Sequence, residues 1–99
     1  MKEKQLLLIF KCLSDSSRLQ ILNYLGDGEL CACELLEFLH ISQSTLSYHM
    51  KIMLQCGLIK VRQVGKWSYY RINKEDFLDF KDYINDLKFS DKRRSECEE

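Results

Sequence analysis

The sequence has no proline and only four glycines among its 99 residues, and it contains no internal repeat. Linkers between domains are typically rich in proline, glycine and small polar residues, so we expect one domain with a small core. The longest purely apolar run, Leu6 to Phe10, is too short for a membrane span or a signal peptide. We therefore expect a cytoplasmic protein that has no contact with membranes.

Acidic residues are missing from the window Ile41–Ile72, although the whole chain has 15 acidic and 15 basic residues. Five basic residues lie inside this window: Lys51, Lys60, Arg62, Lys66 and Arg71. The window should therefore give a neutral protein a local positive surface. Phosphate contact dominates the affinity of proteins for nucleic acid, so this segregation of charge favours DNA as a partner.

The same window predicts a helix followed by a β-hairpin. Ser42 is a suitable N-cap, apolar residues then recur at helical spacing, and Gly57 stands where a left-handed residue would end the helix. Two runs rich in β-branched and aromatic residues then flank the turn Gly65-Lys66: Leu58–Val64 and Trp67–Ile72. The polar face of the helix could enter a major groove. An ordinary amphipathic helix beside a solvated hairpin would show part of this pattern, but helix, hairpin and charge together favour DNA.

Apolar periodicity predicts four more helices in a mainly α fold with two antiparallel strands. Their expected ranges are Lys4–Leu13, a second helix capped by Ser14 or Asp15 that ends at Gly26–Gly28, then Leu30–Leu39, and Lys74–Phe89 after an Asn73 cap. The short link from His40 to Ser42 would make a helix-turn-helix of the third and fourth helices. This domain would span residues 1–89, and the charged residues 90–99 would form a mobile tail.

The first helix is apolar all the way round, from Leu6 to Phe10. A helix of this kind must be covered on several sides, and a chain this short has little else to cover it. We therefore expect a homodimer that is held together by the first and last helices.

Three segments of the chain resemble the ArsR/SmtB family of winged helix-turn-helix repressors, and its arsenic-sensing branch most closely. These segments are FKCLSDSSRLQILNYL near the start, ISQSTLSYHMKIMLQCGLI around the fourth helix, and GKWSYYRI in the hairpin. The resemblance implies a homodimer that binds a palindromic double-stranded operator as a repressor and is released by an inducer, usually a soft metal ion. It implies no cofactor for DNA binding itself.

The resemblance also indicates which residues contact DNA. It places Lys66 at the wing tip and the following residues on the DNA-reading helix: Gln43, Ser44, Thr45, Ser47 and His49. The polar face of that helix adds Tyr48 and Lys51, and the positive charge of the hairpin adds Arg62. His49 has a second interpretation, because it borders the apolar face and could simply hold the helix in place.

Cys31 and Cys33 lie in the segment LCACEL, which resembles the metal-binding box of the arsenic-, cadmium- and lead-sensing repressors. Two soft thiolates select thiophilic ions such as As(III), Cd(II), Pb(II) or Zn(II) over hard cations. We expect trivalent arsenic, as arsenite or methylarsenite, to be the inducer. Residues two apart on a helix point about 200° away from each other. We therefore expect chelation to unwind the first turn of the third helix and so to move the DNA-reading helix.

The third ligand stays open. Arsenic sensors of this branch place a further cysteine three residues after the pair, where this chain has Leu36. Cys12, Cys56 or Cys97 could supply it, or there is none, and a two-thiolate site would suit a methylated arsenical. Zinc and nickel sensors of the family use Asp and His on the last helix, but Lys74–Phe89 contains no histidine. Alternatively, Cys31 only packs in the core and Cys33 has no role.

Other functions remain possible for the same chain. The repressor could respond to Cd(II), Pb(II) or Zn(II). Alternatively, Cys31 and Cys33, or one of them with Cys12 or Cys56, could oxidise in place of binding metal and act as a redox switch. An enzyme is not expected. The sequence has no Cys-x-x-Cys motif, no glycine-rich phosphate loop and only two histidines from which to assemble a catalytic set.

Overall fold

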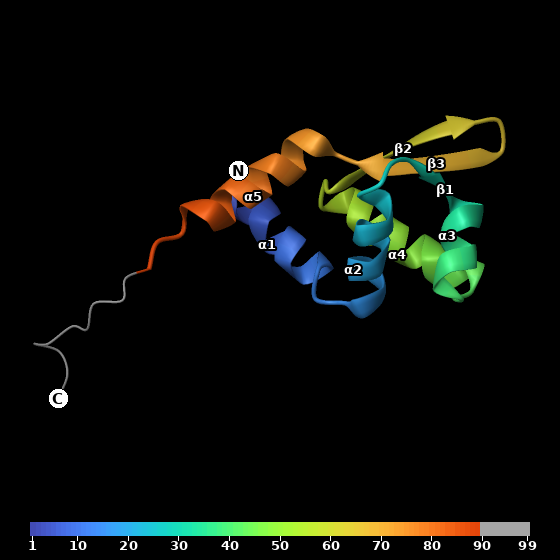
Figure 1. The fold of residues 1–99 in the computed structure, drawn as a ribbon, viewed down its shortest axis with the longest axis horizontal. Helices are drawn as coiled ribbons and strands as arrows, with labels where there is room; N and C mark the ends of the chain where they lie inside the picture. Colours follow the sequence, from blue (N-terminus) through green and yellow to red (C-terminus); the bar gives the residue numbers. More distant parts are fainter. Residues whose placement is uncertain (90–99) are drawn as a thin grey trace, which may run out of the picture.

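A computed structural model describes residues 1–89, which form five α-helices and one antiparallel sheet of three strands (Figure 1). Their order is α1 (Glu3–Cys12), α2 (Ser16–Leu25), β1 (Leu30–Cys31), α3 (Ala32–Leu39), α4 (Gln43–Gln55), β2 (Ile59–Val64), β3 (Trp67–Ile72) and α5 (Lys74–Asp86). The expected tail, 90–99, lies outside the described residues, and so does Cys97. Within residues 1–89, every helix is too short or too polar to cross a lipid bilayer.

Polar side chains start three of the helices as the sequence predicted. The carboxylate of Asp15, rather than Ser14, caps α2 by accepting a hydrogen bond from the Arg18 amide at 3.1 Å. Ser42 caps α4 in the same way, and Asn73 caps α5. Each cap satisfies a backbone N–H that the first helical turn leaves without a partner, so the element boundaries follow from local sequence.

The helix-turn-helix and the wing are confirmed. Helix α3 ends at Leu39 and is capped by His40, which adopts the left-handed conformation with φ 54°, and α4 begins three residues after His40. Strands β2 and β3 pair in register on either side of the turn at Gly65 and Lys66. Figure 1 shows the turn of this hairpin and the start of α4 at the same end of the molecule, away from the end of α5.

The sheet contains a strand that the sequence analysis did not predict. The third helix was expected to begin at Leu30, but Leu30 and Cys31 are extended and pair with Tyr70 and Tyr69 of β3. The strand order is therefore β1-β3-β2. The backbone hydrogen bonds to β3 outweigh the helical preference of the first two residues, and α3 starts only at Ala32.

Helix α5 is also shorter than expected, because it ends at Asp86 and not at Phe89. Its last turn carries no basic residue and ends with an aspartate, whose charge is unfavourable at the negative end of the helix dipole. Leu87 leaves the helix with an extended backbone, and Phe89 is 91% exposed.

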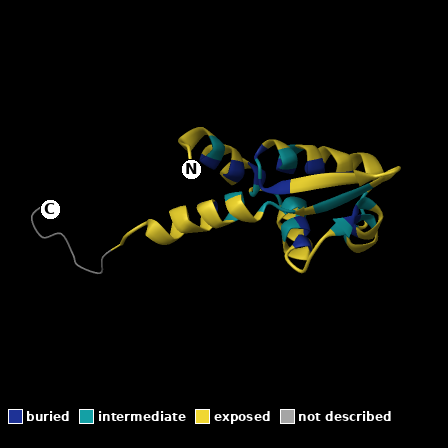
Figure 2. Cartoon of the chain, turned by 90° about the horizontal axis from the view of Figure 1, so that it is seen from above, coloured by how far each residue is buried: buried dark blue, intermediate teal, exposed yellow. Residues whose placement is uncertain are grey.

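The core is a single cluster beneath the sheet to which α1, α2, α3 and α4 all contribute. Its fully buried side chains include Ile9, Ile21, Leu35, Met53 and Leu58. Helix α5 joins it through Phe80, whose ring packs edge-on against Phe10 of α1 at 5.5 Å between centroids. Only one side of α1 and of α5 is buried in this way, as the colouring of the chain by burial in Figure 2 shows.

Apolar side chains remain exposed on α1 and α5 of the single chain. Leu7 and Leu8 of α1 are 54% and 42% exposed, and Leu78 and Ile84 of α5 are 55% and 43% exposed. One chain therefore leaves part of α1 uncovered, and the expected cover by a second copy stays a prediction.

Gly57 provides a test of how the helices meet at the end of α4. Its φ is +87°, and a Cβ there would lie 2.7 Å from Nε2 of Gln5 and 2.8 Å from Oδ2 of Asp76, two atoms that hydrogen-bond each other. We expect Gly57→Ala to lower the free energy of unfolding by about 2 to 3 kcal/mol, from left-handed strain and the lost hydrogen bond.

Gly65→Ala is the matched control, because φ is +60° and nothing lies within 4 Å of the added Cβ. It should cost only the strain, about 1 to 2 kcal/mol. Urea unfolding followed by circular dichroism at one protein concentration measures both values, and equal losses would contradict this role for the Gln5–Asp76 contact.

Candidate DNA-binding surface and cysteine pair

Helix α4 separates its core residues from a polar, exposed face. Leu46, Met50 and Met53 are buried in the core. Six of the predicted DNA-contacting residues are exposed on the other side: Gln43, Ser44, Thr45, Ser47, Tyr48 and Lys51. Tyr48 carries the one aromatic ring among these six residues, and 61% of its surface is exposed. This face is free, within one chain, to approach a nucleic acid.

His49 does not belong to this face, because it is buried at 7% exposure. The guanidinium of Arg18 lies 3.0 Å from its Nδ1, and the carboxylate of Asp15 lies 3.9 Å away. Arg18 can only donate, so Nδ1 is the acceptor. The same Arg18 donates from Nε to the carbonyl of Cys12 at 2.6 Å. His49 thus ties α4 to α2, as the packing interpretation expected, and direct contact with DNA is not what this geometry supports.

The two predicted basic residues of the hairpin, Lys66 and Arg62, make different contacts. Lys66 is exposed in the turn, with its Nζ 5.6 Å from the ring of Trp67. Arg62 is exposed too, but it donates from Nε and from its terminal nitrogen to the two carboxylate oxygens of Glu29, each at 2.8 Å. The expectation of a positive window without acids was thus incomplete: Glu29 comes from outside the window and folds onto it.

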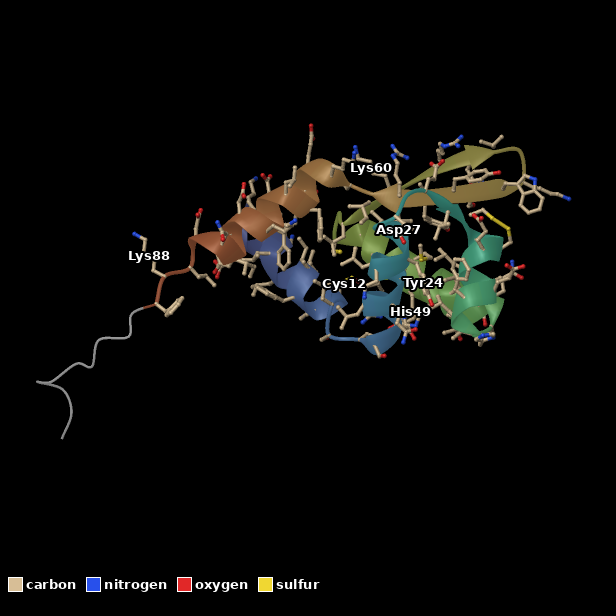
Figure 3. All side chains as sticks on the ribbon, in the orientation of Figure 1. Cys12, Tyr24, Asp27, His49, Lys60 and Lys88 are labelled. Atoms are coloured by element: carbon tan, nitrogen blue, oxygen red, sulfur yellow. A yellow bond between two sulfur atoms is a disulfide. The ribbon has the colours of Figure 1, made fainter. Side chains whose placement is uncertain are left out.

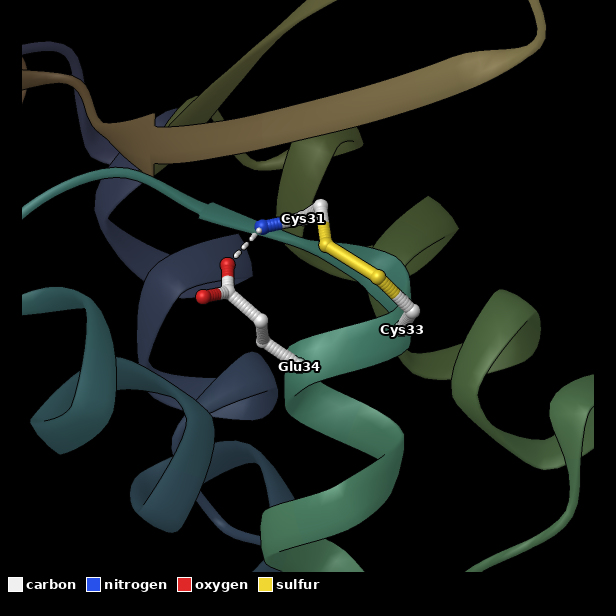
Figure 4. The surroundings of a disulfide bond; sticks show 3 residues. All are labelled: Cys31, Cys33 and Glu34. Carbon is white, nitrogen blue, oxygen red and sulfur yellow. Dashed lines mark hydrogen bonds between the residues drawn. A yellow bond between two sulfur atoms is a disulfide. The ribbon is translucent and has the colours of Figure 1, made fainter.

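Cys31 and Cys33 lie on either side of the junction between β1 and α3, and their sulfurs are joined in a disulfide (Figure 4). Cys31 is the residue before the helix, with an extended backbone, and Cys33 is the second residue within it. Their Cα atoms are 5.4 Å apart. Cys31 is buried at 7% exposure, whereas Cys33 faces solvent. Cys31 is therefore buried, as the packing interpretation expected, but its sulfur still meets that of Cys33.

This geometry corrects the predicted consequence of chelation. The prediction placed both cysteines on a helix, so that the first turn had to unwind before they could share a ligand. Because Cys31 is extended, the two sulfurs already meet, and no helical turn has to open. The side chain of Glu34 also accepts a hydrogen bond from the Cys31 amide at 2.9 Å, which holds the junction in this form (Figure 4).

Neither of the other two cysteines of the described chain is placed to be the third ligand. Cys12 and Cys56 are both buried in the core, and the thiol of Cys56 donates to the Met53 carbonyl at 3.3 Å. Hydrogen bonding with Cys56 and burial raise the pKa of the Cys12 thiol well above its usual range, so it stays protonated. Figure 3 shows Cys12 at the centre of the molecule and the Cys31–Cys33 bond near the wing. Residues 1–89 contain no cluster of three metal-ligating side chains.

Two residues that matter for this region, Glu29 and Arg18, were not singled out from the sequence. Glu29 is 33 residues from Arg62, so no local spacing connects them. One sequence signal does point to Glu29: it directly precedes the cysteine box, and a strand formed by that box would place Glu29 beside the hairpin. Arg18 lies on α2, and only the packing of α2 on α4 brings it to His49.

The chain is similar in sequence to known bacterial regulators. Residues 15–61 match the family described as bacterial regulatory protein, arsR family. The arsenical resistance operon repressor of Staphylococcus xylosus is 49% identical over 85 residues, which cover 86% of this chain and 78% of that protein. The arsenical resistance operon repressor of Staphylococcus aureus is 44% identical over 93 residues, covering 94% of this chain and 89% of that protein.

The fold has solved relatives as well. One is the solution structure of a homodimeric winged helix-turn-helix DNA-binding domain from Mycobacterium bovis, a possible ArsR-family transcriptional regulator. It has a TM-score of 0.72 and 28% identity, and the match covers 83% of this chain and 76% of that one. By both sequence and structure, this chain belongs to the arsR family of bacterial regulatory proteins and has their winged helix-turn-helix fold.

Proposed function

We propose that this protein is a dimeric transcriptional repressor that leaves its operator DNA when trivalent arsenic is captured by Cys31 and Cys33. The observation that carries the proposal is that the sulfurs of Cys31 and the exposed Cys33 meet at the junction between α3 and a strand that pairs directly with the wing. Relatives that are 49% and 44% identical are arsenical resistance operon repressors, which supports the same inducer. A cytoplasmic location and the absence of enzymatic activity belong to the same proposal.

The reduced pair suits a thiophilic ligand. A cellular dithiol that gives up two electrons and two protons converts the disulfide to two thiols, and both are then available. Cys33 meets the solvent, and Cys31 anchors the ligand to β1. Both lie at the positive end of α3, which favours thiolates over thiols. Bound trivalent arsenic would supply a centre that holds two thiolates at once. Since residues 1–89 hold no third donor beside them, a methylated arsenical, which needs only two sulfurs, fits best.

The exposed face of α4 and the tip of the wing would contact DNA. Hydrogen-bonding side chains on α4 suit base edges in a major groove, and Lys66 suits a phosphate beside it. The start of α4 and the tip of the wing lie at one end of the molecule (Figure 1). No cofactor is needed for these contacts.

Oxidation is a second candidate signal, because the structure joins Cys31 to Cys33 in a disulfide. Hydrogen peroxide would take two electrons and two protons from the two thiols and become water. In this form the same junction would be locked by the sulfur–sulfur bond, and arsenic would have no free thiolate to bind.

The cysteine pair is tested with Cys31→Ser and Cys33→Ser. Serine is close in size and suits the position before a helix, so we expect the reduced variants to bind operator DNA within about twofold of wild type. Arsenite or methylarsenite should release the wild type and neither variant. Fluorescence anisotropy of labelled operator at fixed salt measures both properties.

Three results of this titration would count against the proposal. Normal release of the variant that combines Cys31→Ser with Cys33→Ser would place the inducer site elsewhere. Release of the wild type by Cd(II) or Zn(II) but not by the arsenicals would change the inducer. Release by peroxide alone would establish the oxidative alternative.

The dimer is tested on α5. We propose that the exposed apolar residues of α1 and α5 pack against a second copy. The solved relative from Mycobacterium bovis is homodimeric, which supports a dimer. Leu78→Glu should therefore weaken dimerisation about tenfold or more, because it puts a charge where an apolar side chain is buried between subunits.

Leu19→Glu is its matched control, since Leu19 is 46% exposed but lies on α2. Sedimentation velocity over a concentration series should show a shift toward monomer for Leu78→Glu alone. Equal behaviour of the two variants would place the dimer interface elsewhere.

The wing tip is tested with Lys66→Ala. If Lys66 neutralises a phosphate, its loss should weaken binding to all DNA sequences alike and lower the slope of log affinity against log salt by about 1. Lys88→Ala is the control, because Lys88 is also exposed but lies beyond α5, far from the wing (Figure 3). An unchanged slope for Lys66→Ala would remove the wing tip from the interface.

A further inference from the structure

Glu29 and Arg62 form a two-point ion pair between the loop before β1 and the middle of β2. Nε and a terminal nitrogen of the guanidinium each donate to a different carboxylate oxygen at 2.8 Å. The guanidinium also lies over the ring of Tyr69, 4.8 Å from its centroid. Hydrogen bonding from Arg62 holds the pKa of the Glu29 carboxyl below its ordinary value, so the carboxylate is charged at neutral pH.

This pair lies next to the cysteine box. Glu29 directly precedes β1, and Cys31 is two residues further along. Tyr69 of β3 is the cross-strand partner of Cys31 on one side and of Arg62 on the other. One residue of β3, Tyr69, therefore lies between the cysteine box and Arg62. The ion pair of Glu29 with Arg62 is a second connection between them.

The same guanidinium is a candidate phosphate contact of the wing. A carboxylate and a phosphate both use the planar fork of arginine, so Arg62 cannot offer it to both at once. The pair is exposed, and exposed ion pairs are weak enough for a phosphate of DNA to displace the carboxylate. Glu29 is thus placed to compete with DNA for Arg62.

We propose that Glu29 is an internal competitor of operator phosphate for Arg62, and that ligand capture at Cys31 and Cys33 strengthens its hold. Bridging the two cysteines fixes the backbone at the start of α3 and so restricts the loop that carries Glu29. Arg62 is then kept on the carboxylate, and the operator loses a phosphate contact. This inference rests on the proposed function for its arsenic step, but the competition itself requires only DNA binding.

The first test compares Glu29→Gln with Asp27→Asn in the reduced protein without arsenic. Both remove one negative charge from the same loop, but Asp27 makes no side-chain hydrogen bond or ion pair within the described residues. Glu29→Gln should raise operator affinity about two- to fivefold, the range that an exposed ion pair can supply, and Asp27→Asn should do so much less. In an Arg62→Ala background the effect of Glu29→Gln should fall to that of Asp27→Asn.

Each other outcome contradicts the competition. Equal gains for the two single variants would show a general charge effect. Weaker binding of Glu29→Gln would show that the pair positions the wing for DNA. A gain that persists without Arg62 would separate Glu29 from the arginine.

The second test titrates arsenite or methylarsenite into the operator complexes. Glu29→Gln should need several times more arsenical for half-release than wild type, whereas Asp27→Asn should match wild type. If wild type is released and Glu29→Gln follows the same curve, the coupling to the cysteines is wrong. Failure of the wild type to respond would instead overturn the proposed function, while the affinities measured without arsenic would still decide the competition.

Discussion

The pairing of two residues, Leu30 and Cys31, with Tyr70 and Tyr69 determines what this fold can do with its cysteines. It makes the first half of the cysteine box part of the wing sheet and leaves the second half at the start of α3. One change at this junction therefore reaches both elements, since α3 leads through a three-residue turn into α4. Without β1 the box would be a helical turn, its sulfurs would point apart, and the wing would have no backbone link to it.

Burial divides the cysteines of the described chain into two kinds. Cys12 and Cys56 are core residues whose thiols contact each other and the backbone, and the Cys12 thiol stays protonated, whereas the hydrogen bond from Cys12 lowers the pKa of Cys56 to about 7. Cys31 and Cys33 stand at a helix N-terminus, with one sulfur in solvent. Thiol reactivity requires solvent access as well as thiolate character, so the burial of Cys12 and Cys56 leaves the second pair as the one suited to capture of a soft ligand or to oxidation.

Much of the fold was predictable because its signals are local. Asp15, Ser42 and Asn73 cap their helices, apolar residues recur along α4, and Gly65-Lys66 turns the hairpin. Strand β1 was not predictable, because two residues are too few to show alternation. The ion pair of Glu29 with Arg62 and the contact of Arg18 with His49 join residues 33 and 31 apart, which only the folded chain brings together. The end of α5 depends on contacts that run out after Phe80, and the sequence shows only that apolar residues continue.

Amide hydrogen exchange of the reduced protein, with and without arsenite or methylarsenite, tests most directly whether the cysteine box acts through the sheet. Bridging Cys31 and Cys33 should slow exchange not only around residues 29–34 but also in β3 at Tyr69 and Tyr70, which pair with β1. The slowing should be absent in Cys33→Ser. Slowing confined to α3, or exchange in β3 that does not change, would contradict a route from the cysteines to the wing through β1.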